Sequence, residues 1–281
     1  MAWWVWPLSL FALCFVLGMI AVPAGVGGGV LFVPIVSGFF PFHLDFVRGA
    51  GLLVALASAV AAAPGLLRAG LADLRLALPL ALLASASSIV GALMGLALPV
   101  AAVQTALGVT ILCIVALMWL AKKSEFPDIR QTDSLAAALR IHGVFHDAVH
   151  RREIAWKVHR TSLGLVLFVG IGVLAGLFGL GAGWANVPAL NLVMGVPLRL
   201  SAGSSGFILS IVDSSAVWVY INKGAVLAII AAPSVIGMML GAFIGARLLT
   251  IVKASTIRKL VIALLLLAGL RALAKGTGVW V

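Results

Sequence analysis

Two glycine-rich segments have the spacing expected of a binding site built from backbone. They run from Ala24 to Pro34 and from Ala175 to Pro188, and Gly25 precedes its proline by nine positions, as Gly179 does. Glycine is less favourable than alanine by about 1 kcal/mol in a helix interior, so such clusters should interrupt a helix. A short apolar run follows each cluster, and its first N–H groups and positive dipole end would point at the cluster. Two such ends facing each other predict an anion site made of backbone.

The candidate substrate-binding residues are glycines that allow close backbone approach, together with amides and hydroxyls that could donate hydrogen bonds to an oxyanion. They are Gly25, Gly27, Gly28, Gly29, Gly179, Gly181, Gly183, Asn186, Ser204 and Ser205. The alternative for glycine is tight helix crossing, of which the pairs Gly91/Gly95 and Gly241/Gly245 are typical. For the amides and hydroxyls, the alternative is hydrogen bonding between helices.

Asp213 is the candidate coupling residue. It lies midway along the apolar run from Ala202 to Ile221 and has no counterpart in the first half of the chain. An acid at that depth is costly to bury and could exchange protons near neutral pH, as a coupling group does. The alternatives are an ion pair with Arg48 or Arg199, or the capping of a helix break.

The composition is that of a polytopic membrane protein. Hydrophobic residues make up 63% of the 281 residues and charged residues only 10%, far below the roughly 25% of soluble domains. The net charge of +11 therefore suggests positive loops beside anionic lipid rather than nucleic-acid binding. Metalloprotease, nucleotide-binding and serine-hydrolase motifs are absent from the sequence, so we expect no enzyme activity, no catalytic residues, no metal and no cofactor.

The elements that would position these residues occur twice. Landmarks recur at an offset of 154: Gly25 with Gly179, Pro34 with Pro188, Gly70 with Gly224 and Pro79 with Pro233. The short runs from Val30 to Phe40 and from Trp184 to Met194 span only about half a bilayer, and three longer runs follow each of them. We therefore predict an all-α integral membrane protein with two repeats, each a broken or re-entrant short-helix pair plus three longer transmembrane helices.

This duplication divides the chain into a first membrane repeat (1–121), a basic connector (122–160) and a second membrane repeat (161–281). The positive charge of the connector predicts that it is cytoplasmic. An inverted second repeat leaves fewer Lys and Arg residues outside than a parallel one, so the charges favour inverted repeats.

The connector itself has two interpretations. His142, His146 and His150 are spaced four apart, which on a helix would align three imidazoles as for a metal. The same stretch is also consistent with a β-hairpin turning near Asp147 to Arg151. Because Gly143 interrupts the helix and no cysteine or paired carboxylate joins the histidines, the sequence favours a cytoplasmic flap or lipid-surface segment.

The two glycine clusters, each followed by a proline, and the small-residue stretch Ala202-Gly203-Ser204-Ser205 resemble the TauE/SafE sulfite-exporter family, also called the toluenesulfonate uptake permease family. The clusters are Gly25-Val-Gly27-Gly28-Gly29 with Pro34 and Gly179-Leu-Gly181-Ala182-Gly183 with Pro188. The resemblance covers nearly the whole chain. It implies a multi-pass permease of the bacterial inner membrane that transports small sulfur oxyanions or organosulfonates, coupled to an ion gradient.

The expected partners are therefore a small anionic substrate, a coupling proton or cation and membrane lipid, with homo-oligomerisation left open. We expect a secondary carrier that works by alternating access. Two other functions remain open at this point: a channel-like anion pore, and an accessory membrane subunit that docks a partner through the connector.

Overall fold

Long apolar runs with few charges form the helices of the computed structural model, which describes residues 4–24, 27–68, 72–120, 127, 132–139, 141–147, 152–248 and 254–279. The first half contains α1 (Val5–Ala24), α2 (Gly28–Phe39), α3 (Leu44–Arg68), α4 (Leu74–Ala97) and α5 (Val100–Leu120). The second half contains α7 (Thr161–Phe178), α8 (Gly183–Pro188), the π-helix η1 (Ala189–Val193), α9 (Leu198–Asn222), α10 (Ala228–Leu248) and α11 (Ala254–Gly276). Within the described part of the chain, six of these helices are long and apolar enough to cross a membrane.

Each half has one short helical element in second place, as predicted. The 12 residues of α2 extend about 18 Å, and α8 and η1 together form a helical stretch of similar length in the second half. This is little more than half the roughly 30 Å of a bilayer core. One expectation was wrong in detail, because Gly28, Gly29 and Gly183 lie in the first helical turn rather than in an unwound segment. Residues in a first turn donate no N–H hydrogen bond to their own helix. Glycine at these positions therefore disturbs the hydrogen bonds of the helix less than glycine in its interior.

The two halves interlock. The first helix of each half packs along the fourth helix of the other, so that α1 lies on α10 and α7 lies on α4. Glycines allow this close approach: a Cβ on Gly241 would overlap the carbonyl oxygen of Phe15, and one on Gly91 would overlap that of Val173. The close crossing expected for these glycine pairs is therefore observed.

Helices in equivalent positions of the two halves also pack on each other. In the contact of α5 with α11, Gly108 lies against Leu273, whereas Gly276 lies against Thr105. The residue numbers thus rise in opposite directions, which makes these two helices antiparallel. Helices α3 and α9 are antiparallel as well. Gly49 lies against Ala225, which follows the end of α9, while Ala55 and Ala59, later in α3, cluster with Leu209, earlier in α9.

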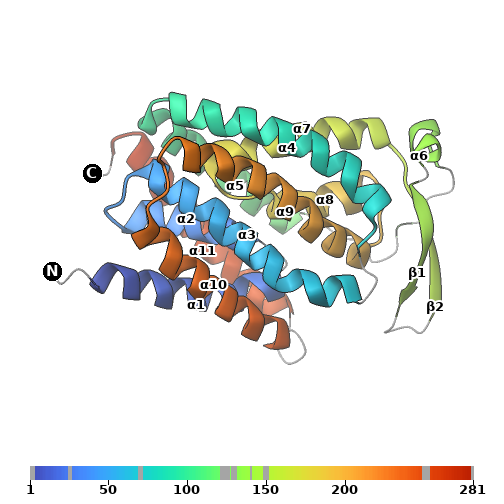
Figure 1. Cartoon of the computed structure of the whole chain (residues 1–281), viewed down its shortest axis with the longest axis horizontal. Helices are drawn as coiled ribbons and strands as arrows, with labels where there is room; N and C mark the ends of the chain where they lie inside the picture. The colour runs from blue at the N-terminus through green and yellow to red at the C-terminus, as the bar shows by residue number, and fades with distance from the viewer. Residues whose placement is uncertain are drawn as a thin grey trace.

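The connector folds as a hairpin rather than a long helix. Strands β1 (His142–Asp147) and β2 (Arg152–Lys157) are antiparallel, with Gly143 opposite Trp156, and α6 (Ser134–Ala138) precedes them. The hairpin lies at one end of the bundle, and the two chain ends lie at the other (Figure 1). His142 and His146 lie on an extended strand, so the helical alignment that the metal hypothesis required is not observed, and His150 lies outside the described residues.

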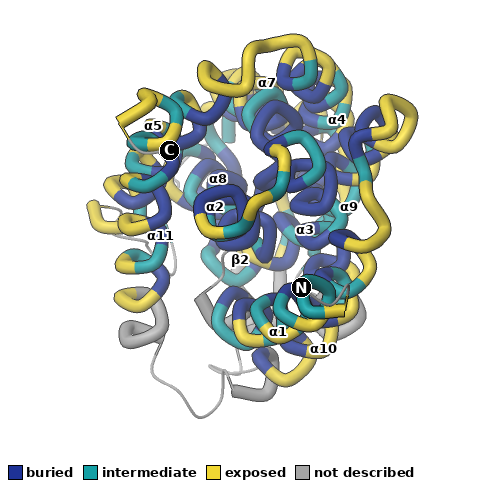
Figure 2. Tube along the Cα trace, turned by 90° about the vertical axis from the view of Figure 1, so that its left-hand side faces the viewer, coloured by how far each residue is buried: buried dark blue, intermediate teal, exposed yellow. Residues whose placement is uncertain are grey.

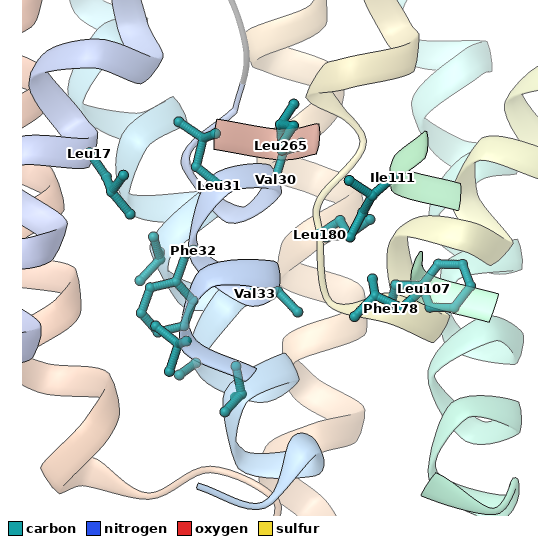
Figure 3. Packing of buried hydrophobic residues seen from close by; sticks show 14 of the residues in the cluster. Leu17, Val30, Leu31, Phe32, Val33, Leu107, Ile111, Phe178, Leu180 and Leu265 are labelled. Carbon is teal, nitrogen blue, oxygen red and sulfur yellow. The ribbon is translucent and has the colours of Figure 1, made fainter. Parts of the chain in front are cut away.

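The short helix α2 occupies the middle of the bundle. Figure 2 looks along the bundle and shows α2 and α8 surrounded by the longer helices. Side chains of α2 belong to one buried cluster that also contains residues at and after the end of α7 and residues of α5 and α11 (Figure 3). The labelled residues of this cluster include Val30, Leu31, Phe32, Val33, Leu107, Ile111, Phe178, Leu180 and Leu265.

We predict that alanine substitutions at two glycines of α7 affect the free energy of unfolding differently. A Cβ on Gly176 would overlap the carbonyl oxygen of Ser88, whereas one on Gly170 meets nothing within 4 Å. Gly176→Ala should lower the free energy of unfolding by about 1–3 kcal/mol through overpacking. Gly170→Ala should leave it unchanged or raise it, because alanine favours helix by about 1 kcal/mol. Thermal unfolding in detergent measures both, and equal midpoints would contradict the packing described here.

Candidate substrate-binding site

The two glycine breaks meet backbone to backbone. Helix α1 ends at Ala24, and Gly27 is the N-cap of α2, with Gly183 beginning α8. A Cβ on Gly183 would lie 3.1 Å from the nitrogen and 3.3 Å from the Cα of Gly27. Among the described residues, the side chain nearest to both glycines is that of Leu209. Gly25, also predicted to belong to the site, lies outside the described residues.

The contact lies at the mid-length of the long helices. A Cβ on Gly29 would be 3.0 Å from Ala55 Cβ, and one on Gly183 would be 2.7 Å from Leu209 Cδ1. Ala55 and Leu209 are each the twelfth residue of a 25-residue helix, α3 and α9 respectively. Because these helices are long enough to span a membrane, the breaks meet close to half their depth.

The electrostatic character of the contact comes from helix N-termini. Gly27 and Ala182 are the N-caps of α2 and α8, and neither supplies a side-chain capping bond. The Gly28 amide donates a long hydrogen bond, 3.4 Å, to Ser58 Oγ. Each helix start carries roughly half a positive charge, so the region between the two starts favours an anion.

Asp213 and Asn186 are fully buried beside the breaks. A Cβ on Gly181 would lie 3.0 Å from Asp213 Oδ2, which puts this carboxylate against the second break. No described residue hydrogen-bonds either carboxylate oxygen of Asp213 or either side-chain polar atom of Asn186. Buried polar atoms are normally paired, so unpaired ones at a break are available to a ligand or a proton.

The ion pair considered for Asp213 is not observed. Arg48 binds Asp45 instead, together with the carbonyl oxygens of Leu177 and Gly95. Arg199 lies in the first turn of α9, about 21 Å along the helix axis from Asp213. Neither cation neutralises Asp213.

The other predicted residues lie around the contact rather than in it. Gly179 has φ +69° and ends α7, and Gly181 has φ +72°, a conformation that favours glycine at both positions. Ser204 Oγ accepts a hydrogen bond from the Asp73 amide, 3.2 Å, and so links α9 to the start of α4. Ser205 is buried one helical turn before Leu209.

Ser58 and Trp184 are further polar groups that sequence reasoning did not single out. Ser58 is the lone hydroxyl of α3 and contacts the start of α2. The indole Nε1 of Trp184, on α8, is buried without a hydrogen-bond partner among the described residues. An isolated hydroxyl in an apolar helix was the available signal for Ser58.

A comparison with protein-family models matches residues 10–272 to the family described as Sulfite exporter TauE/SafE. The match includes both glycine breaks and every predicted site residue. No curated protein and no solved structure matches the chain.

We predict that crowding at Gly181 impairs transport, whereas equal backbone strain elsewhere does not. Gly181 and Gly224 have φ +72° and +67°, so alanine at either position costs about 1–2 kcal/mol. Only at Gly181 would the new methyl meet Ala55 and Asp213, since nothing lies within 4 Å at Gly224. Flux of a sulfur oxyanion in proteoliposomes should fall at least about tenfold in Gly181→Ala and persist in Gly224→Ala. Equal flux in the two variants would count against a site at this break.

Proposed function

Because the chain belongs to the sulfite exporter TauE/SafE family of membrane transporters, we propose that it is a secondary carrier that moves small sulfur oxyanions or organosulfonates by alternating access. The protein is a multi-pass membrane transporter of sulfur anions and not an enzyme. The backbone contact of Gly27 with Gly183, at the mid-length of α3 and α9, is the observation that carries the proposal.

The proposed site binds the anion by backbone amides and neutral donors. The starts of α2 and α8, whose N-cap residues supply no side-chain cap, provide N–H groups and positive dipole ends. The Asn186 amide, which has no hydrogen-bond partner among the described residues, can donate to a sulfonate or sulfite oxygen. Glycine at positions 27, 28, 29, 181 and 183 lets the backbone at the breaks approach neighbouring segments closely.

Alternating access is supported by the arrangement of the two halves, which we propose are inverted repeats. Equivalent helices run in opposite directions where they pack, as α5 does on α11. In inverted repeats, a site at the interface can open to either side when one half moves against the other. The basic connector would then be cytoplasmic in a bacterial inner membrane, with the repeats covering 1–121 and 161–281.

Coupling is assigned to Asp213. An ionised carboxylate against Gly181 would repel an anion at the breaks, whereas a protonated one would not. Binding of the anion and of a proton should therefore favour each other. This predicts that both move in the same direction.

The first test is a graded substitution at Gly27. A Cβ there would make only ordinary contacts, 3.6 Å to Leu209 Cδ1 and 3.8 Å to Gly183 Cα, so the Gly27→Ala variant should fold. Gly27→Ala should reduce sulfite flux into proteoliposomes, and Gly27→Leu should abolish it, because the side chain would occupy the space between the breaks.

Gly170→Leu is the matched control, because nothing lies within 4 Å of a Cβ at that position. It should retain flux. Normal flux in a folded Gly27→Leu protein would rule out a site at the contact, and flux that does not saturate with sulfite would indicate a channel.

The second test addresses coupling. In wild-type proteoliposomes, an inwardly directed proton gradient should accelerate sulfite uptake. Asp213→Asn removes the titrating group and keeps a similar shape, so uptake should persist without responding to the gradient. A variant that still responds to the gradient would show that Asp213 is not the coupling residue.

A further inference from the structure

Arg48 is a buried cation close to the second break. Only 1% of its side chain is exposed. Nη1 donates to the carbonyl oxygen of Leu177, 2.9 Å away, and Nη2 donates to that of Gly95, 3.1 Å away, and to Asp45 Oδ1. Its guanidinium carbon lies 5.8 Å from the centre of the Tyr220 ring.

Part of this arrangement is structural. Leu177 and Gly95 lie in the last turns of α7 and α4, where carbonyl oxygens lack partners in their own helix. The guanidinium satisfies one carbonyl of each helix. A cation at two helix C-termini is also favoured by their dipoles.

Two observations go beyond this capping role. The Nε–H of Arg48 is buried and has no acceptor among the described residues. Asp45, the acid that binds the guanidinium, is 25% exposed and lies in the first turn of α3, where water can replace Arg48 as its partner. The guanidinium therefore has one unused N–H and one ligand that can leave.

Arg48 also lies between the site and one end of the bundle. A Cβ on Gly179 would lie 2.6 Å from the Arg48 Cα, so the arginine touches the second break directly. Ala55, at the contact of the breaks, is seven residues further along α3, about 10 Å. The loop that precedes α3 lies at the end of the bundle opposite the hairpin (Figure 1).

The same end is positively charged. Lys275 Nζ donates to the carbonyl oxygen of Ser37, 3.0 Å away, and Arg271 donates to that of Gly38. Lys223 follows the end of α9, near the start of α3. Asp45 is the one acid that the described residues place at this end, where these cations would attract anions.

We propose that Arg48 is a second contact point for the transported anion, which we call the relay. The Asp45 carboxylate binds the guanidinium of Arg48 until the anion displaces this carboxylate. This inference rests on the proposed function. A sulfite or sulfonate group presents oxygens that can accept from Nε and Nη2 together, which the Asp45 carboxylate does not do here. The anion would pass from Arg48 to the helix starts along α3.

The test measures KM for sulfite and for methanesulfonate in proteoliposomes. Asp45→Asn removes the competing carboxylate, and KM should fall about threefold or more. Arg48→Lys keeps a cation for the carbonyl oxygens but loses the planar fork, and KM should rise about tenfold. Asp73→Asn is the matched control, since it removes one negative charge at the start of α4, and its KM should stay at the wild-type value.

Each outcome has a separate meaning. If Asp45→Asn shifts the unfolding temperature but leaves KM unchanged, the pair is structural and the relay is wrong. The relay is also wrong if Asp73→Asn lowers KM as much as Asp45→Asn does, because the change in net charge would then explain the effect. If the wild-type protein transports neither probe, the proposed function itself fails. If the wild-type protein transports them, and Arg48→Lys and Asp45→Asn both have the wild-type KM, only the relay fails.

Discussion

The structure depends on how the polar backbone groups at its helix breaks find partners away from bulk water. Carbonyl oxygens in the last turns of helices are bound by this chain's own side chains: Leu177 by Arg48, Gly176 by the Tyr220 hydroxyl, and Ser37 by Lys275. The N-termini of α2 and α8 differ from these C-termini. They face each other, and the side chains of their N-cap residues do not cap them. The positive dipole ends of these two helices make the centre of the bundle suited to an anion.

Glycine makes this arrangement geometrically possible at two levels. At the helix crossings, residues such as Gly176 and Gly241 let backbones touch and hold the two halves together. At the breaks, Gly27 and Gly183 bring two chain segments into contact at the mid-length of α3 and α9. The same residue type thus provides both the close packing and the access to backbone that the proposed site requires.

Much of the fold follows from the sequence, because run length and glycine spacing reflect membrane thickness and backbone constraints directly. The order of the membrane helices and the short helix in each half could be predicted, whereas the sequence left the connector open between a helix and a β-hairpin. The site could be predicted only in part. Gly27 lies against Gly183 and Asp213 against Gly181, but Ser204 binds the start of α4. The contacts of Ser58 and Arg48 depend on packing between distant segments. A single sequence contains no signal for such pairings.

The central claim is that an anion binds between the two breaks. Selenite resembles sulfite and contains selenium, so an anomalous difference map of crystals grown with selenite would locate it directly. The account predicts a selenium peak within hydrogen-bond reach of the backbone at Gly27 to Gly29 and Gly183. A peak found only at the ends of the bundle, with none between the breaks, would contradict it.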